Sequence, residues 1–262
     1  MKMPRRLISL WVMIVTLLLA GCAGVSEKEV VKEADPVAEA ERLLASGEFR
    51  EAALAFNALA KNASGPQQTR FLLRTAAALA RDDRVHQSRQ ILDNLQPDSR
   101  DRQQLFLLNL TEAHIALSER HAQEVLRILE QAPPAQVSYH YLADYHQLRA
   151  AAYTMLGNRI DTAGELVKRE PHLQNQDLIE DNQGAIWEAL AMMNERTLAQ
   201  MRMATGKNVL GGWMELVQIS KAYQLDPEVL NRRVAEWRNS YPEHPVQAVS
   251  YTHLTLPTKR IV

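Results

Sequence analysis

Apolar residues recur along much of the chain at the spacing of one helix face. When Ala52, Ser88, Val125 and Ala163 are aligned as one equivalent position, the intervals between them are 36, 37 and 38 residues. The residues three before and four after each position are all apolar: Phe49, Phe56, Val85, Leu92, Ala122, Leu129, Ile160 and Val167. Offsets of −3 and +4 place side chains on one face of an α-helix. The pattern therefore predicts a helix that recurs four times.

A short polar segment precedes each recurrence of this helix. These segments are Ser46-Gly47-Glu48, Arg81-Asp82-Asp83, Ser118-Glu119-Arg120 and Gly157-Asn158-Arg159. Each repeating unit is therefore predicted to be a helix, a turn and a second helix. Helix stops are predicted where proline removes a backbone donor and clashes with the preceding turn. They fall at Gly65-Pro66, Pro97, Pro133-Pro134 and Pro171.

The repeat from about residue 36 to residue 171 loosely resembles the tetratricopeptide solenoids, whose motif is about 34 residues long. The small-residue pattern of that motif is only partly kept. The resemblance implies stacked helical hairpins with a surface suited to binding a partner. No segment alternates for long between apolar and polar residues, so the predicted fold class is all-α. A generic helical bundle with coincidental spacing is the alternative.

A second section, from about Asp177 to Ala248, is also helical but lies outside the repeat register. Asp226 and Pro227 predict a helix start there, since aspartate caps helices and proline suits the first helical position. Three tryptophans are expected in three successive helices of this section: Trp187, Trp213 and Trp237. Each has an apolar neighbour at helical spacing. We expect them to pack in a core, and a ligand-stacking role is the alternative.

The N-terminus has the pattern of an export signal. Lys2, Arg5 and Arg6 precede an apolar stretch from residue 7 to residue 20. A membrane-spanning helix would need about 20 apolar residues. The stretch is shorter and is followed by many charged residues, so a cleaved signal is the better interpretation.

The four residues at the end of this stretch resemble the lipobox of bacterial lipoproteins. They are Leu19, Ala20, Gly21 and Cys22. The resemblance implies cleavage before Cys22 and lipidation of its thiol, and two or more acyl chains make such an anchor stable. Ala23 rather than aspartate after the cysteine implies sorting to the outer membrane, with the body of the protein facing the periplasm.

Composition narrows the remaining possibilities. Cys22 is the only cysteine, so neither an intramolecular disulfide nor a thiolate metal cluster can form. The 262 residues, 46% of them hydrophobic, are enough to bury a sizeable core. The chain has 30 Lys and Arg against 31 Asp and Glu, and removal of a signal over residues 1–21 takes away three cations and no anion. The resulting mild acidity argues against a nucleic-acid partner.

Three segments of the second section resemble the N-terminal domain of the LpoA family. They are Ile186–Leu190, Val209–Leu216 and Glu236–Pro245, and the likeness extends over about residues 36 to 247. The family consists of outer-membrane lipoproteins that activate a bifunctional class A penicillin-binding protein, chiefly its peptide cross-linking activity. The resemblance therefore implies a non-enzymatic regulator of peptidoglycan synthesis. Its expected partners are that synthase and peptidoglycan, and no cofactor is expected.

The expected domain organisation follows from these patterns. It consists of a signal peptide (1–21), a lipidated tether (22–35), a TPR-like solenoid (36–176), a C-terminal helical part of the same domain (177–248) and a tail (249–262). The tail resembles the translation of sequencing-adapter DNA. The family's second domain, shaped like a periplasmic binding protein, would begin near this point, so the chain is expected to be a truncated N-terminal part.

Candidate sites are few. Six histidines have no recognised metal-ligand spacing: His86, His114, His121, His140, His146 and His172. His140 and Asp144 could share a helix face, but two groups do not make a metal site. Tyr139, Tyr141 and Tyr145 form an aromatic patch with His140 and His146. It could bind glycan or peptide, although packing of an inner helix is the commoner reason for such a patch.

No enzyme motif is present: the chain has no GxSxG, no SxxK and no glycine-rich phosphate loop. We therefore predict no catalytic residue. A lytic transglycosylase-like muramidase is the enzymatic alternative, with Glu188 the acid that sequence alone does not dismiss. A TPR-like scaffold lipoprotein for outer-membrane protein assembly is the alternative among interaction proteins.

Overall fold

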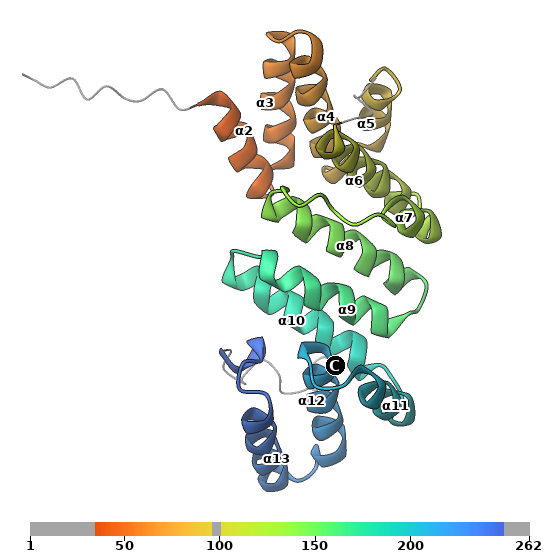
Figure 1. The fold of residues 1–262 in the computed structure, drawn as a ribbon, viewed down its shortest axis with the longest axis vertical. Coiled ribbons are helices and arrows are strands. Elements are labelled where there is room, and N and C mark those ends of the chain that lie inside the picture. Colours follow the sequence, from red (N-terminus) through yellow and green to blue (C-terminus); the bar gives the residue numbers. More distant parts are fainter. Residues whose placement is uncertain (1–34, 96–100, 249–262) are drawn as a thin grey trace, which may run out of the picture. The chain divides into compact units, whose positions relative to one another are not determined.

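The computed structural model describes residues 35–95 and 101–248, and every regular element within these residues is a helix (Figure 1). The α-helices are α2 (Pro36–Ala45), α3 (Phe49–Lys61), α4 (Gly65–Arg81), α5 (Val85–Leu92), α6 (Arg102–Ser118), α7 (Ala122–Ile128), α8 (Tyr139–Met155), α9 (Arg159–Arg169), α10 (Gln176–Ala191), α11 (Glu195–Thr205), α12 (Val209–Tyr223) and α13 (Pro227–Ser240). Two 3-10 helices are η1 (Glu170–His172) and η2 (Pro245–Ala248). Within the described ranges, no helix combines the length and apolarity needed to cross a bilayer. The predicted all-α fold is confirmed.

The first eight helices of the described residues form four consecutive hairpins: α2 with α3, α4 with α5, α6 with α7, and α8 with α9. From the second hairpin onwards the first helices of successive hairpins also touch, because α4 packs on α6 and α6 packs on α8. This is the arrangement of a solenoid, in which each unit contacts its neighbours. The pattern changes after α9, since α10 packs chiefly on α9 and α12, and α12 also contacts α11 and α13. The predicted solenoid followed by further packed helices is therefore confirmed.

All four hairpins close with the same left-handed turn. The residue with positive φ is Gly47 (84°), Asp83 (58°), Arg120 (65°) or Gly157 (74°). In each turn the next residue donates its backbone N–H to the carbonyl five positions earlier, at 2.8–2.9 Å. This hydrogen bond defines the Schellman ending of a helix, which satisfies carbonyls that would otherwise lack a donor. The four polar segments are therefore equivalent turns.

The turns also set the register of the repeat. In each hairpin, one residue of the second helix donates its N–H to the carbonyl of the residue that directly follows the positive-φ residue. In the first three hairpins the donors are Ala52, Ser88 and Val125, and in the fourth hairpin the donor is Thr162. The sequence alignment was thus right for three units and displaced by one residue at Ala163. Ala163 is nevertheless fully buried, as are the three other aligned residues. The hydroxyl of Ser88 is accommodated because it donates to the carbonyl of Ala76 at 2.8 Å.

The predicted helix stops had mixed outcomes. Pro133-Pro134 lies between α7 and α8, and Pro171 lies in η1 immediately after α9. Gly65-Pro66 was wrong as a stop, since both residues lie in the first turn of α4. The physical reason is that proline in a first helical turn forfeits only an N–H that has no helical partner anyway. Pro97 lies outside the described residues.

The last hydrophobic cluster contains the tryptophans of the second section. Trp213 and Trp237 are fully buried, and Trp187 packs against the same cluster while remaining partly exposed. The expectation of core packing is confirmed. The expectation of three successive helices was wrong, because α11 intervenes between the helices of Trp187 and Trp213. Asp226 caps α13 as predicted, with its carboxylate accepting the N–H of Val229 at 3.1 Å.

Two of the segments that resemble the LpoA family pack against each other. The indole of Trp237 donates to the carbonyl of Gly212 at 2.9 Å, and the Nε2 of His244 donates to the carbonyl of Val209 at 2.9 Å. The His244 ring lies edge-on to Trp213 and Trp237, with centroids 5.2 and 5.0 Å away. These residues thus join α12 to the end of α13, and their role is to hold the fold.

The left-handed turn residues provide a test of the hairpin geometry. Because a Cβ is strained at positive φ, Gly47→Ala is expected to destabilise the protein by about 1 kcal/mol. For the same reason Arg120→Gly, at an exposed position, is expected to stabilise it by about 1 kcal/mol. Urea unfolding followed by circular dichroism measures both. Shifts of the same sign for the two variants would contradict the turn geometry.

Candidate functional site

A groove of about 590 Å³ is bordered by residues from α2, α3, α4, α6, α8, α9, η1 and α10. Its borders include the turn between α2 and α3 and the segment that leads from η1 into α10. The side chains that line it include three arginines, three histidines and one aspartate. They are Arg42, Arg81, Arg169, His114, His140, His172 and Asp144. The groove is therefore a highly charged concavity.

Asp144 of α8 lies at the centre of this charged set and is only 8% exposed. The Nε2 of His114 donates to both carboxylate oxygens, at 2.8 and 2.9 Å, and the Arg81 guanidinium lies 3.7 Å from one of them. Burial would raise the pKa of Asp144, but the charges of Arg81 and His114 outweigh burial and lower it to about 2. The carboxylate is therefore ionised at neutral pH and ties α4, α6 and α8 together.

His140 and Tyr139 lie one helical turn before Asp144. Burial, together with the charge of Arg81, lowers the pKa of His140 to about 4, so this histidine is neutral at physiological pH. Both His140 and Asp144 belong to α8, as the sequence suggested, but the hydrogen-bonded partner of Asp144 is His114. Tyr139 is 40% exposed at the groove border.

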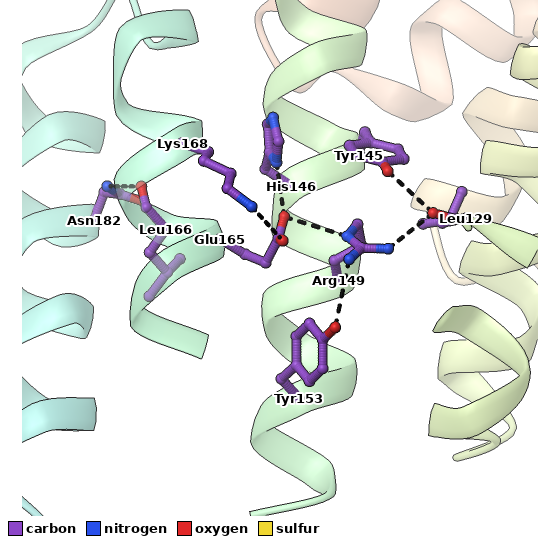
Figure 2. A network of polar contacts seen from close by, with 9 residues as sticks. All are labelled: Leu129, Tyr145, His146, Arg149, Tyr153, Glu165, Leu166, Lys168 and Asn182. Carbon is purple, nitrogen blue, oxygen red and sulfur yellow. Dashed lines mark hydrogen bonds and ion pairs between the residues drawn. The ribbon is translucent and has the colours of Figure 1, made fainter. Parts of the chain in front are cut away.

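A buried polar network holds α8, the helix that carries this site, against its neighbours (Figure 2). Glu165 of α9 is 4% exposed and accepts from the Nδ1 of His146 at 2.8 Å. The Arg149 Nε lies 3.3 Å from the same carboxylate, and the Lys168 Nζ donates to it at 3.1 Å. Burial would raise the pKa of Glu165, but the hydrogen bond from His146 and the charge of Arg149 lower it to about 2. Glu165 therefore links α9 to α8 as a carboxylate.

The same network reaches the helices on either side. The carbonyl of Leu129, just beyond α7, accepts from the Tyr145 hydroxyl at 3.0 Å and from Arg149 at 2.8 Å (Figure 2). On the far side of α9, the Asn182 amide donates to the carbonyl of Leu166 at 3.0 Å. Side chains thus satisfy backbone carbonyls near two helix ends. The helices α7, α8, α9 and α10 are joined in one row.

The structure places the remaining predicted residues as follows. Tyr145 is buried and Tyr141 packs among three hydrophobic clusters, so this part of the aromatic patch contributes to core packing.

Glu188 is exposed on α10 and borders a second groove of about 430 Å³ together with Asp181. Among the described residues, no three His, Cys, Asp or Glu side chains are grouped to hold a metal ion. The lipidation residue Cys22 and the lipobox residues Leu19, Ala20 and Gly21 lie outside the described residues.

The roles of three charged residues at buried or partly buried positions were not found from sequence. These residues are Arg81, Arg149 and Glu165. The signal that was available is the position of Glu165 between Ala163 and Leu166 on the buried face of α9. A carboxylate at a core position needs cationic or hydrogen-bonding partners, so its position alone predicts a network.

The described residues define the class as an all-α protein of stacked helical hairpins that end in a tryptophan-rich helical section. Residues 52–256 match the family model described as LppC putative lipoprotein. The chain therefore belongs to the LppC family. The match continues past Gln247, where the likeness was expected to end.

Two relatives named as penicillin-binding protein activators also align with the chain. The chain is 24% identical over 199 residues to a protein of Pantoea ananatis named penicillin-binding protein activator LpoA, which covers 76% of this chain and 28% of that protein. The Escherichia coli K12 protein of the same name is 24% identical over 64% of this chain and 24% of its own length. The chain thus spans about a quarter of the length of these relatives.

Solved structures match the fold. The crystal structure of the E. coli LpoA amino-terminal domain has a TM-score of 0.68 at 22% identity, covering 78% of this chain and 90% of that one. The crystal structure of full-length LpoA from Haemophilus influenzae has a TM-score of 0.62 at 20% identity. The match covers 75% of this chain and 36% of that one. At these identities the likeness establishes the fold and leaves the activity to be argued separately.

Proposed function

We propose that the chain forms the helical arm of a lipid-anchored activator of a penicillin-binding protein. The observation that carries the proposal is the alignment, over 76% of the chain, with a protein named as such an activator. The fold match to the amino-terminal domain of another activator supports it. Cys22 would attach the arm to the inner leaflet of the outer membrane, and the solenoid would extend into the periplasm towards peptidoglycan.

The proposed role is regulatory and requires no catalytic group in this chain. The synthase would form the peptide cross-links, and the helical arm would act by binding. The buried carboxylates fit this interpretation, since Asp144 and Glu165 are both engaged by cationic side chains that link helices. A carboxylate held ionised in this way is suited to positioning helices and is poorly suited to donating a proton.

Co-purification and a cross-linking assay test the proposal. The full chain, tagged and expressed in its own host, is expected to retain a class A penicillin-binding protein from membrane extracts. Added to that purified synthase and lipid-linked precursor, it is expected to raise cross-linking less than a full-length relative does, because it spans about a quarter of such a protein. Stimulation equal to that of the full-length relative would contradict this expectation.

Two other results would overturn the proposal itself. Retention of β-barrel assembly factors without any penicillin-binding protein would instead identify a scaffold for outer-membrane protein assembly. Release of anhydro-muropeptides from purified sacculi by the chain alone would identify a muramidase, and Glu188→Gln would then be the first variant to examine. A heat-denatured sample of the chain is the control for adsorbed hydrolases.

A further inference from the structure

The groove beside α8 holds an excess of cationic groups over its single carboxylate. Arg81 and Arg169 both border it, and Asp144 is the only acidic residue in its lining. Asp144 is already engaged through two hydrogen bonds from His114. The guanidinium of Arg81 lies farther from it, at 3.7 Å, and is supported instead by the ring of Phe49 at 4.6 Å. The groove therefore retains positive charge that its own residues do not neutralise.

Three nitrogen atoms of groove residues make no hydrogen bond within the described part of the protein. They are Nη1 of Arg81, Nε of Arg169 and Nε2 of His140, and all are buried. A buried N–H donor without an acceptor is unfavourable, so the two arginine side chains gain free energy by turning such a donor towards an incoming oxygen atom. The Arg169 guanidinium already donates through Nη1 to the side-chain oxygen of Asn182 at 3.0 Å, so Nε of Arg169 and Nη1 of Arg81 are the donors left for a ligand. This arrangement favours an anion with several acceptor oxygens.

The size and borders of the groove favour a peptide over a small ion. At about 590 Å³ it is far larger than a single carboxylate or phosphate needs. It shares the lining residues Gln147, Arg169 and Leu178 with the second groove beside α10, so the two grooves are adjacent and continuous. Tyr139 and Leu178 are 40% and 45% exposed at its border, where they can contact apolar side chains.

From the two arginines, the size of the groove and its exposed apolar border, we infer that the groove binds an extended acidic peptide segment of a partner protein. A carboxylate of the peptide lies between Arg81 and Arg169, and neighbouring apolar side chains lie on Tyr139 and Leu178. Arginine is suited to this role because its planar guanidinium binds carboxylates through two parallel hydrogen bonds. The groove binds such a peptide whether or not the chain activates a penicillin-binding protein.

Fluorescence anisotropy with a labelled peptide tests the inference. The probe is a six-residue peptide of alternating glutamate and leucine, added to the full chain in a non-ionic detergent. The peptide with glutamine in place of glutamate is the matched probe, and it is expected to bind at least about tenfold more weakly, as expected for loss of a charge-assisted hydrogen bond. Equal binding of the two peptides would overturn the inference.

Variants assign the binding to this groove. Arg81→Gln and Arg169→Gln are each expected to weaken binding about tenfold, whereas Arg232→Gln, exposed on α13 and far along the chain from the groove, leaves it unchanged. Tyr139→Ala guards against misfolding of the arginine variants, because its side chain is 40% exposed, and it is expected to weaken binding several-fold. Unchanged binding by Tyr139→Ala and both arginine variants would overturn the inference.

Competition with inorganic phosphate or acetate distinguishes a peptide from a small anion. Neither is expected to displace the peptide at concentrations matched for ionic strength with sodium chloride. Displacement by either ion beyond the sodium chloride control would mean that the groove is a small-anion site, and the peptide inference would then be wrong.

Discussion

Replacement of Glu165 by alanine is expected to destabilise the protein by about 3 to 5 kcal/mol, the usual result of removing one partner from a buried ionic network. Glu165 is 4% exposed, and its carboxylate receives His146, Arg149 and Lys168. Without it, the partly buried guanidinium of Arg149 loses the carboxylate that it faces on α9. Urea unfolding at pH 7 measures the effect.

A matched control for Glu165 is Glu236, which pairs with Arg233 on the exposed side of α13. Glu236→Ala is expected to leave the urea midpoint unchanged, since exposed pairs contribute little. Glu165→Gln preserves the shape of the side chain and removes its charge. Its urea midpoint is expected to lie between those of the alanine variant and the native protein. Equal midpoints for Glu165→Ala and Glu236→Ala would show that the network does not hold α8 and α9 together.

The same residue predicts a dependence of stability on pH. The pKa of Glu165 is about 2 in the folded protein against an ordinary value of 4.5, so the folded state binds the proton more weakly. The stabilisation from its ionisation is therefore complete above about pH 4.5 and is lost as pH falls towards 2. Glu165→Ala is expected to lose less stability than the native protein between pH 5 and pH 3. Urea midpoints at these two pH values measure the difference.

Gly211→Ala is expected to destabilise the protein by about 3 kcal/mol, at the upper end for an added methyl group in a tight core. A Cβ at Gly211 would lie 2.0 Å from the carbonyl oxygen of Gly206. Relief requires movement of backbone, because that oxygen belongs to the turn that leads from α11 into α12. The substitution is therefore expected to separate the start of α12 from α11.

Gly184 provides the matched control, since it lies in the middle of α10 and a Cβ there would meet no atom within 4 Å. Gly184→Ala is expected to stabilise the protein by about 0.5 to 1 kcal/mol through the better helix propensity of alanine. The two variants make the same chemical change with opposite expected signs. A shift of equal size and sign in urea unfolding would contradict the close approach at Gly211.

The repeat was predictable from sequence because apolar spacing reports directly which helix face is buried. Ala52, Ser88 and Val125 were aligned correctly for that reason. The fourth unit was displaced by one residue because the left-handed turn sets the register, and both Thr162 and Ala163 are buried in α9. Spacing alone does not distinguish two adjacent buried positions.

The charged networks were less accessible to sequence analysis. A pairing such as Asp144 with His114 joins helices that lie thirty residues apart in the chain, so it depends on the packing of α6 against α8. Gly65-Pro66 was misjudged for a different reason. The same two residues suit a helix start and a helix stop, and only the position of the following helix decides between them. The alternation of helices and turns predicted the fold, while the candidate groove required their packing.

Most helix contacts in the described residues join elements that are first or second neighbours along the chain. Local contacts of this kind allow folding to begin before the remote parts of a sequence are present. A chain exported N-terminus first, as residues 1 to 21 predict, can therefore close its hairpins one after another as they enter the periplasm. The α2–α3 pair needs nothing from the segment around Trp213 to do so. Under such export, secretion and folding would proceed in the same direction along the polypeptide.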